Sequence, residues 1–160
     1  MAKSNLQLID LLRRTASRLE GGAPYQWGHL GACNCGHLAQ EVTALSADEL
    51  MRRAKGHAAE WNELVVDTCR DSGLPFEWVI DQLMARGLER EDLAKLEYLS
   101  DRRVLARIPL ERRRVMQRQN REDVVLYMRA WADLLDADRE ARQRATPMAA
   151  KVLSDSLPVN

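Results

Sequence analysis

The sequence predicts an all-α protein, a compact bundle of six to eight helices joined by short connections. Apolar residues recur at helical spacing along most of the 160 residues. The chain is rich in Leu, Ala, Arg and Glu, which lose little conformational entropy in a helix. Only 5% of its residues are aromatic. Glycine or proline separates each periodic stretch from the next. Connections this short place successive helices side by side, as in a bundle.

The N-terminal region is expected to form one helix followed by an irregular loop. Leucines at helical spacing predict a helix over 5–20, with Ser4 as its N-cap. Gly21 and Gly22 end this helix because glycine accepts the backbone conformations that follow a helix. Glycines and a proline then interrupt every period over 23–36. We therefore expect an ordered loop there.

Two helices are expected after the loop. A short one begins near Asn34 or Cys35, where helical spacing resumes. Ser46 and Glu49 then have the spacing of a capping box, in which each side chain binds the backbone amide of the other residue. We expect this box to open the longest helix of the chain, which ends at Gly73.

Five further helices are expected in the second half of the chain. Pro75 has a fixed φ that suits the first turn of one helix. Residues 89–108 fit two short helices, and Pro109 begins another. Asn120 caps a last helix, whose apolar period fades after about Arg144.

The chain is expected to form a single domain. Its length fits one hydrophobic core that needs no disulfide or metal for stability. Apolar residues make up 46% of the chain, and 24 basic residues balance 24 acidic ones, a composition that argues against general disorder. We expect a helical domain over 1–144 and a frayed C-terminal tail over 145–160.

The sequence predicts a cytoplasmic protein without a membrane partner. Charged residues such as Asp10 and Arg13 interrupt the first apolar stretch, which therefore does not fit a signal peptide. No stretch approaches the roughly 20 apolar residues that a membrane span needs. The three cysteines, an odd number, indicate reduced thiols rather than a disulfide framework.

Residues 29–37, here called the His/Cys patch, carry the least ordinary chemistry of the chain. They hold four of its six histidine and cysteine residues: His29, Cys33, Cys35 and His37. Imidazole and thiolate are common ligands of zinc and iron, and nearby glycines let the backbone approach closely. The patch therefore predicts a transition-metal site, with zinc or iron undecided and a sensing or redox role. Because Cys-x-Cys is tighter than common zinc spacings, a second ligand set uses Cys33, His37 and His29.

A thiol role is the first alternative for this patch. The start of a helix lowers the pKa of a thiol, so Cys33 or Cys35 can be a reactive thiolate. The order of Gln26, Cys33 at a helix start and a histidine resembles papain-like thiol enzymes, whose active cysteine opens a helix behind a glutamine. The resemblance covers 26–37 and implies a nucleophilic Cys33, but the strands that present the partner histidine in that family are missing. A Cys-x-Cys redox pair and a purely structural role are further alternatives, so the sequence leaves open whether the protein is an enzyme.

Charge is unevenly distributed along this neutral chain. Residues 47–101 hold 13 acidic and 7 basic residues, whereas 102–121 hold eight arginines and one glutamate, a net charge of +7. The arginines can serve a non-enzymatic interaction module that binds an anionic partner, or a homo-oligomeric contact with the acidic region. The neutral total favours a third interpretation, in which they pair with the acidic helices before them. We do not expect a nucleic-acid partner.

Overall fold

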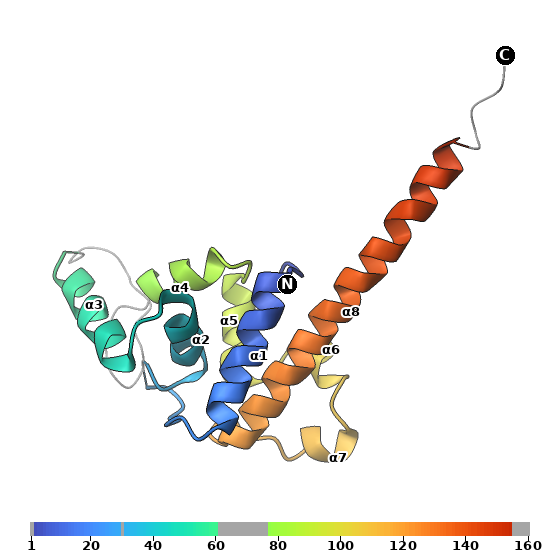
Figure 1. The fold of residues 1–160 in the computed structure, drawn as a ribbon. Coiled ribbons are helices and arrows are strands. Elements are labelled where there is room, and N and C mark those ends of the chain that lie inside the picture. The colour runs from blue at the N-terminus through green and yellow to red at the C-terminus, as the bar shows by residue number, and fades with distance from the viewer. Residues whose placement is uncertain (1, 30, 61–76, 155–160) are drawn as a thin grey trace.

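The computed structural model describes residues 2–29, 31–60 and 77–154, and every regular element in this part of the chain is a helix (Figure 1). The helices are α1 (Leu6–Glu20), α2 (Asn34–Thr43), α3 (Ala47–Glu60), α4 (Glu77–Met84), α5 (Arg90–Tyr98), α6 (Arg102–Leu105), α7 (Leu110–Arg113) and α8 (Arg121–Ser154). Their number and their long-range contacts confirm the predicted all-α bundle of six to eight helices.

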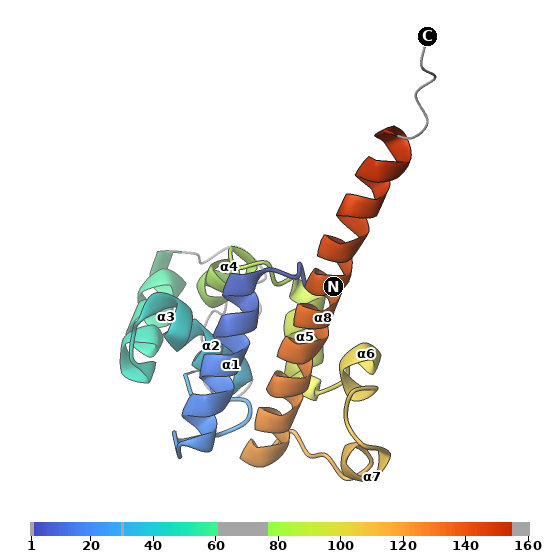
Figure 2. The ribbon, with the colours of Figure 1, turned by 45° about the vertical axis from the view of Figure 1, so that its right-hand side comes forward.

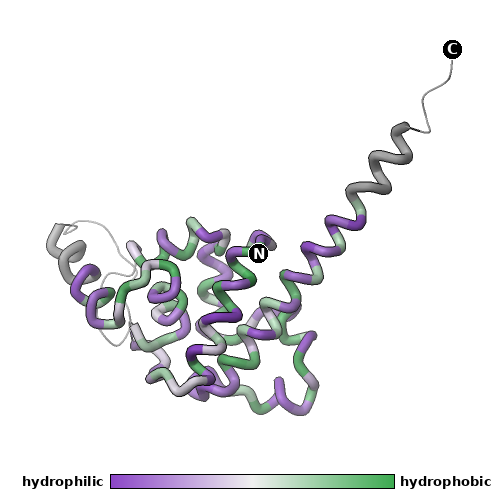
Figure 3. The backbone as a smooth tube through the Cα atoms, viewed as in Figure 1, coloured by the Kyte–Doolittle hydropathy of each residue, from purple (hydrophilic) through white to green (hydrophobic). Residues whose placement is uncertain are grey.

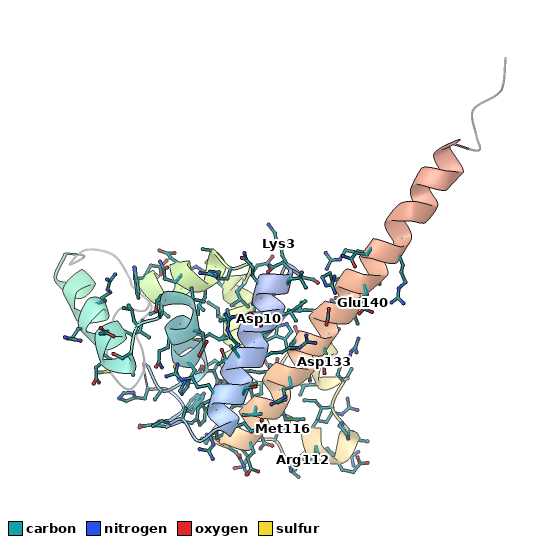
Figure 4. The ribbon with its side chains drawn as sticks, viewed as in Figure 1. Lys3, Asp10, Arg112, Met116, Asp133 and Glu140 are labelled. Atoms are coloured by element: carbon teal, nitrogen blue, oxygen red, sulfur yellow. The ribbon has the colours of Figure 1, made fainter. Side chains whose placement is uncertain are left out.

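The most extensive contact between helices joins α1 to the first half of α8, and these two helices lie side by side in Figures 1 and 2. Leu8 and Leu12 of α1 and Leu135 of α8 are fully buried. Arg13 binds Asp133 and Asp136 of α8 at 3.2 and 3.0 Å, and Figure 4 labels Asp133 on the α8 side of this contact. Such exposed ion pairs contribute little. Apolar burial therefore holds α1 and α8 together.

Helix α2 occupies the centre of the bundle. It contacts α1, α3, α4 and α5. All residues from Asn34 to Gln40 are buried, so the first two turns of the helix have no solvated face. The second half of the His/Cys patch therefore lies inside the protein.

Side chains cap several of the helices, in one case differently from the sequence expectation. Asn5, not Ser4, caps α1, because Asn5 Oδ1 accepts a hydrogen bond from the Leu8 amide at 2.8 Å. The Ser4 hydroxyl instead donates to a carbonyl of α8. The predicted capping box of α3 is confirmed: the Ser46 amide donates to Glu49 Oε2 at 2.8 Å, and the Glu49 amide donates to Ser46 Oγ at 3.3 Å.

Helix α3 begins where its capping box predicts. It starts at Ala47 and is described as far as Glu60. The remainder of the helix that was expected to reach Gly73, with Cys69, lies outside the described residues. The longest helix in the described part is α8, with 34 residues, and not α3.

Helix α8 extends past the rest of the bundle. Figures 1 and 2 show its second half projecting beyond all other helices, and Figure 3 shows mainly hydrophilic residues over 136–145. The helix continues past Arg144 to Ser154. The domain limit at 144 and the fraying of 145–160 stay predictions. No helix among the described residues is long and apolar enough to cross a membrane.

Helices α6 and α7 belong to the segment that connects α5 to α8, and they lie on the side of α8 away from α2–α4 (Figure 2). Asp101 caps α6 by accepting hydrogen bonds from two amides of its first turn. The Asp101 amide donates to the hydroxyl of Tyr127 in α8 at 3.0 Å. Val104 and Ile108 are buried in the core. These contacts hold the segment with α6 and α7 against α8.

Replacing Leu12 with alanine should lower the free energy of unfolding by about 2 to 5 kcal/mol, because a fully buried leucine leaves a cavity. Leu6→Ala removes the same atoms from the same helix at a side chain that is 62% exposed, and should cost about 0.5 kcal/mol or less. Urea unfolding followed by circular dichroism measures both variants. Equal losses would contradict the packing of α1 described above.

Candidate functional site

The loop before α2 folds back on that helix where two glycines meet. A Cβ on Gly36 would lie 2.6 Å from the Gly31 amide nitrogen, so position 36 accepts no side chain unless the backbone moves. Gly31 has a φ of +92°, which favours glycine as well. The amides of Ala32 and Cys33 both donate to the His29 carbonyl, at 3.0 and 2.9 Å. These constraints fix the backbone of the His/Cys patch.

Cys33 is the N-cap residue of α2, which starts at Asn34, and this confirms the predicted helix start near Asn34 or Cys35. Its Sγ accepts a hydrogen bond from the Gly36 amide at 3.4 Å, a role that a Ser, Thr, Asp or Asn oxygen usually fills. The Cys33 residue is only 3% exposed. Its sulfur therefore stabilises the start of the helix.

Cys35 is buried inside the bundle. Burial raises the pKa of its thiol well above the ordinary value, and electrostatic interactions with Glu97 and Cys33 raise this pKa further. A thiol held in its neutral form is a poor nucleophile, so this environment opposes a reactive thiolate at Cys35. The described part of the chain contains no strand that presents a histidine to Cys33, as the papain-like resemblance would require.

The two histidines of the patch each have one buried nitrogen without a partner. His37 Nε2 lies 2.9 Å from the Pro24 carbonyl, and burial lowers the pKa of this imidazole. The ring is therefore neutral near pH 7, and Nε2 donates its proton to Pro24. Among the described residues, Nδ1 of His37 and Nδ1 of His29 have no hydrogen-bond partner. A lone pair on such a nitrogen can accept a hydrogen bond or bind a metal.

The predicted metal ligands do not form a coordination site in this arrangement. Within 2–29, 31–60 and 77–154, no three His, Cys, Asp or Glu side chains are grouped so that they could hold an ion. Cys33 caps α2, and Cys35 is enclosed by the core. Zinc or iron binding by His29, Cys33, Cys35 and His37 therefore stays a prediction, and it requires these side chains to move.

Tyr25 and Asn34 connect the loop to two other parts of the protein, a connection that the sequence did not reveal. The Tyr25 hydroxyl donates to the Arg118 carbonyl at 2.5 Å and lies 2.9 Å from Asn34 Oδ1. Asn34 Nδ2 donates to the Leu96 carbonyl in α5 at 3.0 Å. The loop, α2, α5 and the segment before α8 are thereby joined at one place.

Two aromatic rings hold the Arg118 side chain beside this junction. Its guanidinium carbon lies 4.2 Å from the centre of the Trp27 ring and 4.9 Å from that of Tyr98. The Trp27 and Tyr98 rings are in a T-shaped arrangement, with their centres 6.4 Å apart. Trp27 Nε1 also donates to the Glu97 carbonyl at 3.1 Å. Each cation–π contact is worth about 0.5 to 2 kcal/mol, so Arg118 fastens the loop to α5.

Glu97 is half-buried at this junction. Burial raises its carboxyl pKa to about 7, while a hydrogen bond from the Gly28 amide and the positive charge of Arg118 act in the opposite direction. Nothing in the local sequence separates Glu97 from the other acidic residues of α5, because its environment comes from residues far away in the chain. It is the titratable group that sequence analysis missed.

The eight arginines of residues 102–121, here called the arginine surface, have two different roles. Arg103 binds Asp138 at 2.7 Å, Arg112 binds the buried Asp123 at 2.9 Å, and Arg118 contacts the two rings. Both aspartates belong to α8, so the ion pairs of Arg103 and Arg112 do not use the acidic helices that precede them. Figure 4 labels Arg112 on α7. These anchored arginines position the segment.

The other arginines of the arginine surface are not neutralised by an acidic partner among the described residues. Five exposed arginines form no ion pair with any described residue: Arg102, Arg107, Arg113, Arg114 and Arg121. One of them, Arg113, donates a hydrogen bond to the Leu105 carbonyl at 3.4 Å. Two apolar side chains of the same segment are also exposed, Leu110 at 42% and Val115 at 60%. The arginine surface therefore combines unpaired positive charge with apolar area.

A comparison of the chain with models of protein families, with curated proteins and with solved structures finds no match.

The metal prediction requires near-stoichiometric zinc or iron in untagged wild-type protein, measured by elemental mass spectrometry. The double variant Cys33→Ser/Cys35→Ser should lose this metal, because it removes both thiolate ligands. Cys69→Ser, which removes a thiol outside the patch, is the control and should retain it. Wild-type protein that carries no metal and takes none up would rule the site out.

The Glu97 environment predicts a pH dependence of stability. Its folded-state pKa, about 7, lies above the ordinary value of 4.5, so the fold favours the protonated form. The associated stability is present below the unfolded-state pKa and is lost as pH rises through about 7. The loss between about pH 5 and pH 8 is on the order of 2 kcal/mol.

Glu97→Gln should reduce this loss, because the amide keeps an acceptor for the Gly28 amide but does not ionise. Urea unfolding of both proteins across this pH range measures it. Glu111→Gln, at an exposed glutamate, is the control and should follow the wild type. A Glu97→Gln profile that is as steep as the wild-type profile would contradict the buried environment of Glu97.

Proposed function

We propose that this chain is a non-enzymatic binding module of the cytoplasm that recognises an anionic partner through the arginine surface. The observation that supports the proposal is the set of five exposed arginines without an ion pair to any described residue, on a segment of net charge +7 in a neutral protein. Arginine binds carboxylates and phosphates through a planar group with several donors. An anionic partner would neutralise charge that the described residues leave unpaired.

The way in which the segment is held supports this proposal. Asp101, Asp123 and Asp138 fix its two short helices against α8, and Tyr25 fixes the Arg118 carbonyl. A surface that is already ordered loses less conformational entropy when it binds. The arginines without an ion pair therefore lie on a backbone that is already ordered before the partner binds.

Metal binding by the His/Cys patch is the second candidate function. The buried, unpartnered Nδ1 atoms of His29 and His37 favour it, because ring nitrogens of this kind are metal ligands. The grouping of the ligands in space does not favour it. A reactive thiol has less support, since Cys35 is held as a neutral thiol and Cys33 caps a helix.

The binding proposal predicts that labelled poly-glutamate binds the protein at low salt and is released as salt rises, because the contacts are exposed. Arg107→Gln/Arg114→Gln should raise the dissociation constant about tenfold, since exposed charge pairs contribute up to about 1 kcal/mol each. Fluorescence anisotropy measures both effects.

The matched control for this experiment is Lys3→Gln/Arg52→Gln. It removes the same charge from exposed residues that lie outside the arginine surface, so it should leave the dissociation constant within about twofold of the wild type. Equal losses in the two double variants would show that net charge alone attracts the polyanion. Absence of binding at low salt would contradict the proposal.

A further inference from the structure

The composition of the arginine surface narrows the class of partner. All eight of its basic residues are arginine, and none is lysine. Arginine is enriched in protein–protein interfaces and lysine is depleted there. This choice of cation fits a protein partner that offers carboxylates.

The exposed apolar residues point to the same class. Leu110 and Val115 stand at the two ends of α7 and its following turn, with Arg112, Arg113 and Arg114 between them. Single exposed apolar residues are common on protein surfaces and need no explanation alone. Here they share one short segment with unpaired charge. A purely charged chain would gain nothing from them, whereas a peptide with large apolar side chains would bury them.

The same segment lacks the features that nucleic acids require. Helices α6 and α7 have four residues each, too few to lie in a major groove and contact base edges. Single strands bind by stacking their bases on aromatic rings. The two rings that lie against a side chain of the segment, Trp27 and Tyr98, are both in contact with the Arg118 guanidinium.

We infer that the partner of the arginine surface is an acidic peptide segment of another protein, one that combines Asp or Glu with large apolar side chains. Its carboxylates pair with Arg107 and Arg114, and its apolar side chains cover Leu110 and Val115. This inference rests on the proposed function and adds the chemical class of the partner.

Three labelled probes test the inference against the full-length protein. They are a short peptide of glutamates and leucines, the same peptide with every leucine replaced by serine, and a single-stranded oligonucleotide of equal net charge. The glutamate–leucine peptide should bind about tenfold more tightly than the glutamate–serine peptide, because only the former covers apolar surface. It should also bind more tightly than the oligonucleotide.

A pair of variants locates the apolar contribution. Leu110→Ser/Val115→Ser should remove the difference between the two peptides. Leu6→Ser/Met84→Ser is the matched control, since these side chains are 62% and 40% exposed outside the arginine surface, and it should preserve the tenfold difference. Circular dichroism of both variants confirms that they fold.

The outcomes separate the inference from the proposed function. Equal affinity for the two peptides, or tighter binding of the oligonucleotide, would overturn the peptide inference and leave an anion-binding surface. Failure of all three probes to bind at low salt would overturn the proposed function together with it.

Discussion

The contact between Gly36 in α2 and the backbone at Gly31 determines where the residues of the His/Cys patch lie. Because Gly36 has no side chain, the loop packs directly on α2, the central helix. That packing makes Cys33 a helix cap and encloses Cys35 and His37 in the core. The His/Cys patch is thus part of the scaffold in this arrangement.

The scaffold also supports the arginine surface, which we propose binds the partner. Tyr25 in the loop holds the Arg118 carbonyl, while Trp27 contacts the Arg118 side chain. The arginine surface is consequently tied both to the loop and, through Asp123 and Asp138, to α8. A change at the loop–α5 junction would therefore reach the arginine surface through Arg118.

Local patterns predicted the helices, whereas contacts between distant residues decided the candidate site. Apolar spacing and the Ser46–Glu49 box predicted the bundle and the start of α3, because both features lie within a few residues. Spacing alone did not indicate that Asn5 caps α1 while Ser4 binds α8. Nor did it reveal the Glu97 environment or the ion pairs of the arginine surface with α8, which depend on how the helices pack.

The central claim is that the arginine surface, and not the His/Cys patch, meets the partner. Backbone amide chemical shifts of isotope-labelled protein, followed by NMR as the glutamate–leucine peptide is added, test it most directly. We expect shifts at Arg107, Leu110 and Val115, with the amides of His29 and Cys33 unchanged. Shifts confined to the patch, with the arginine surface unaffected, would contradict it.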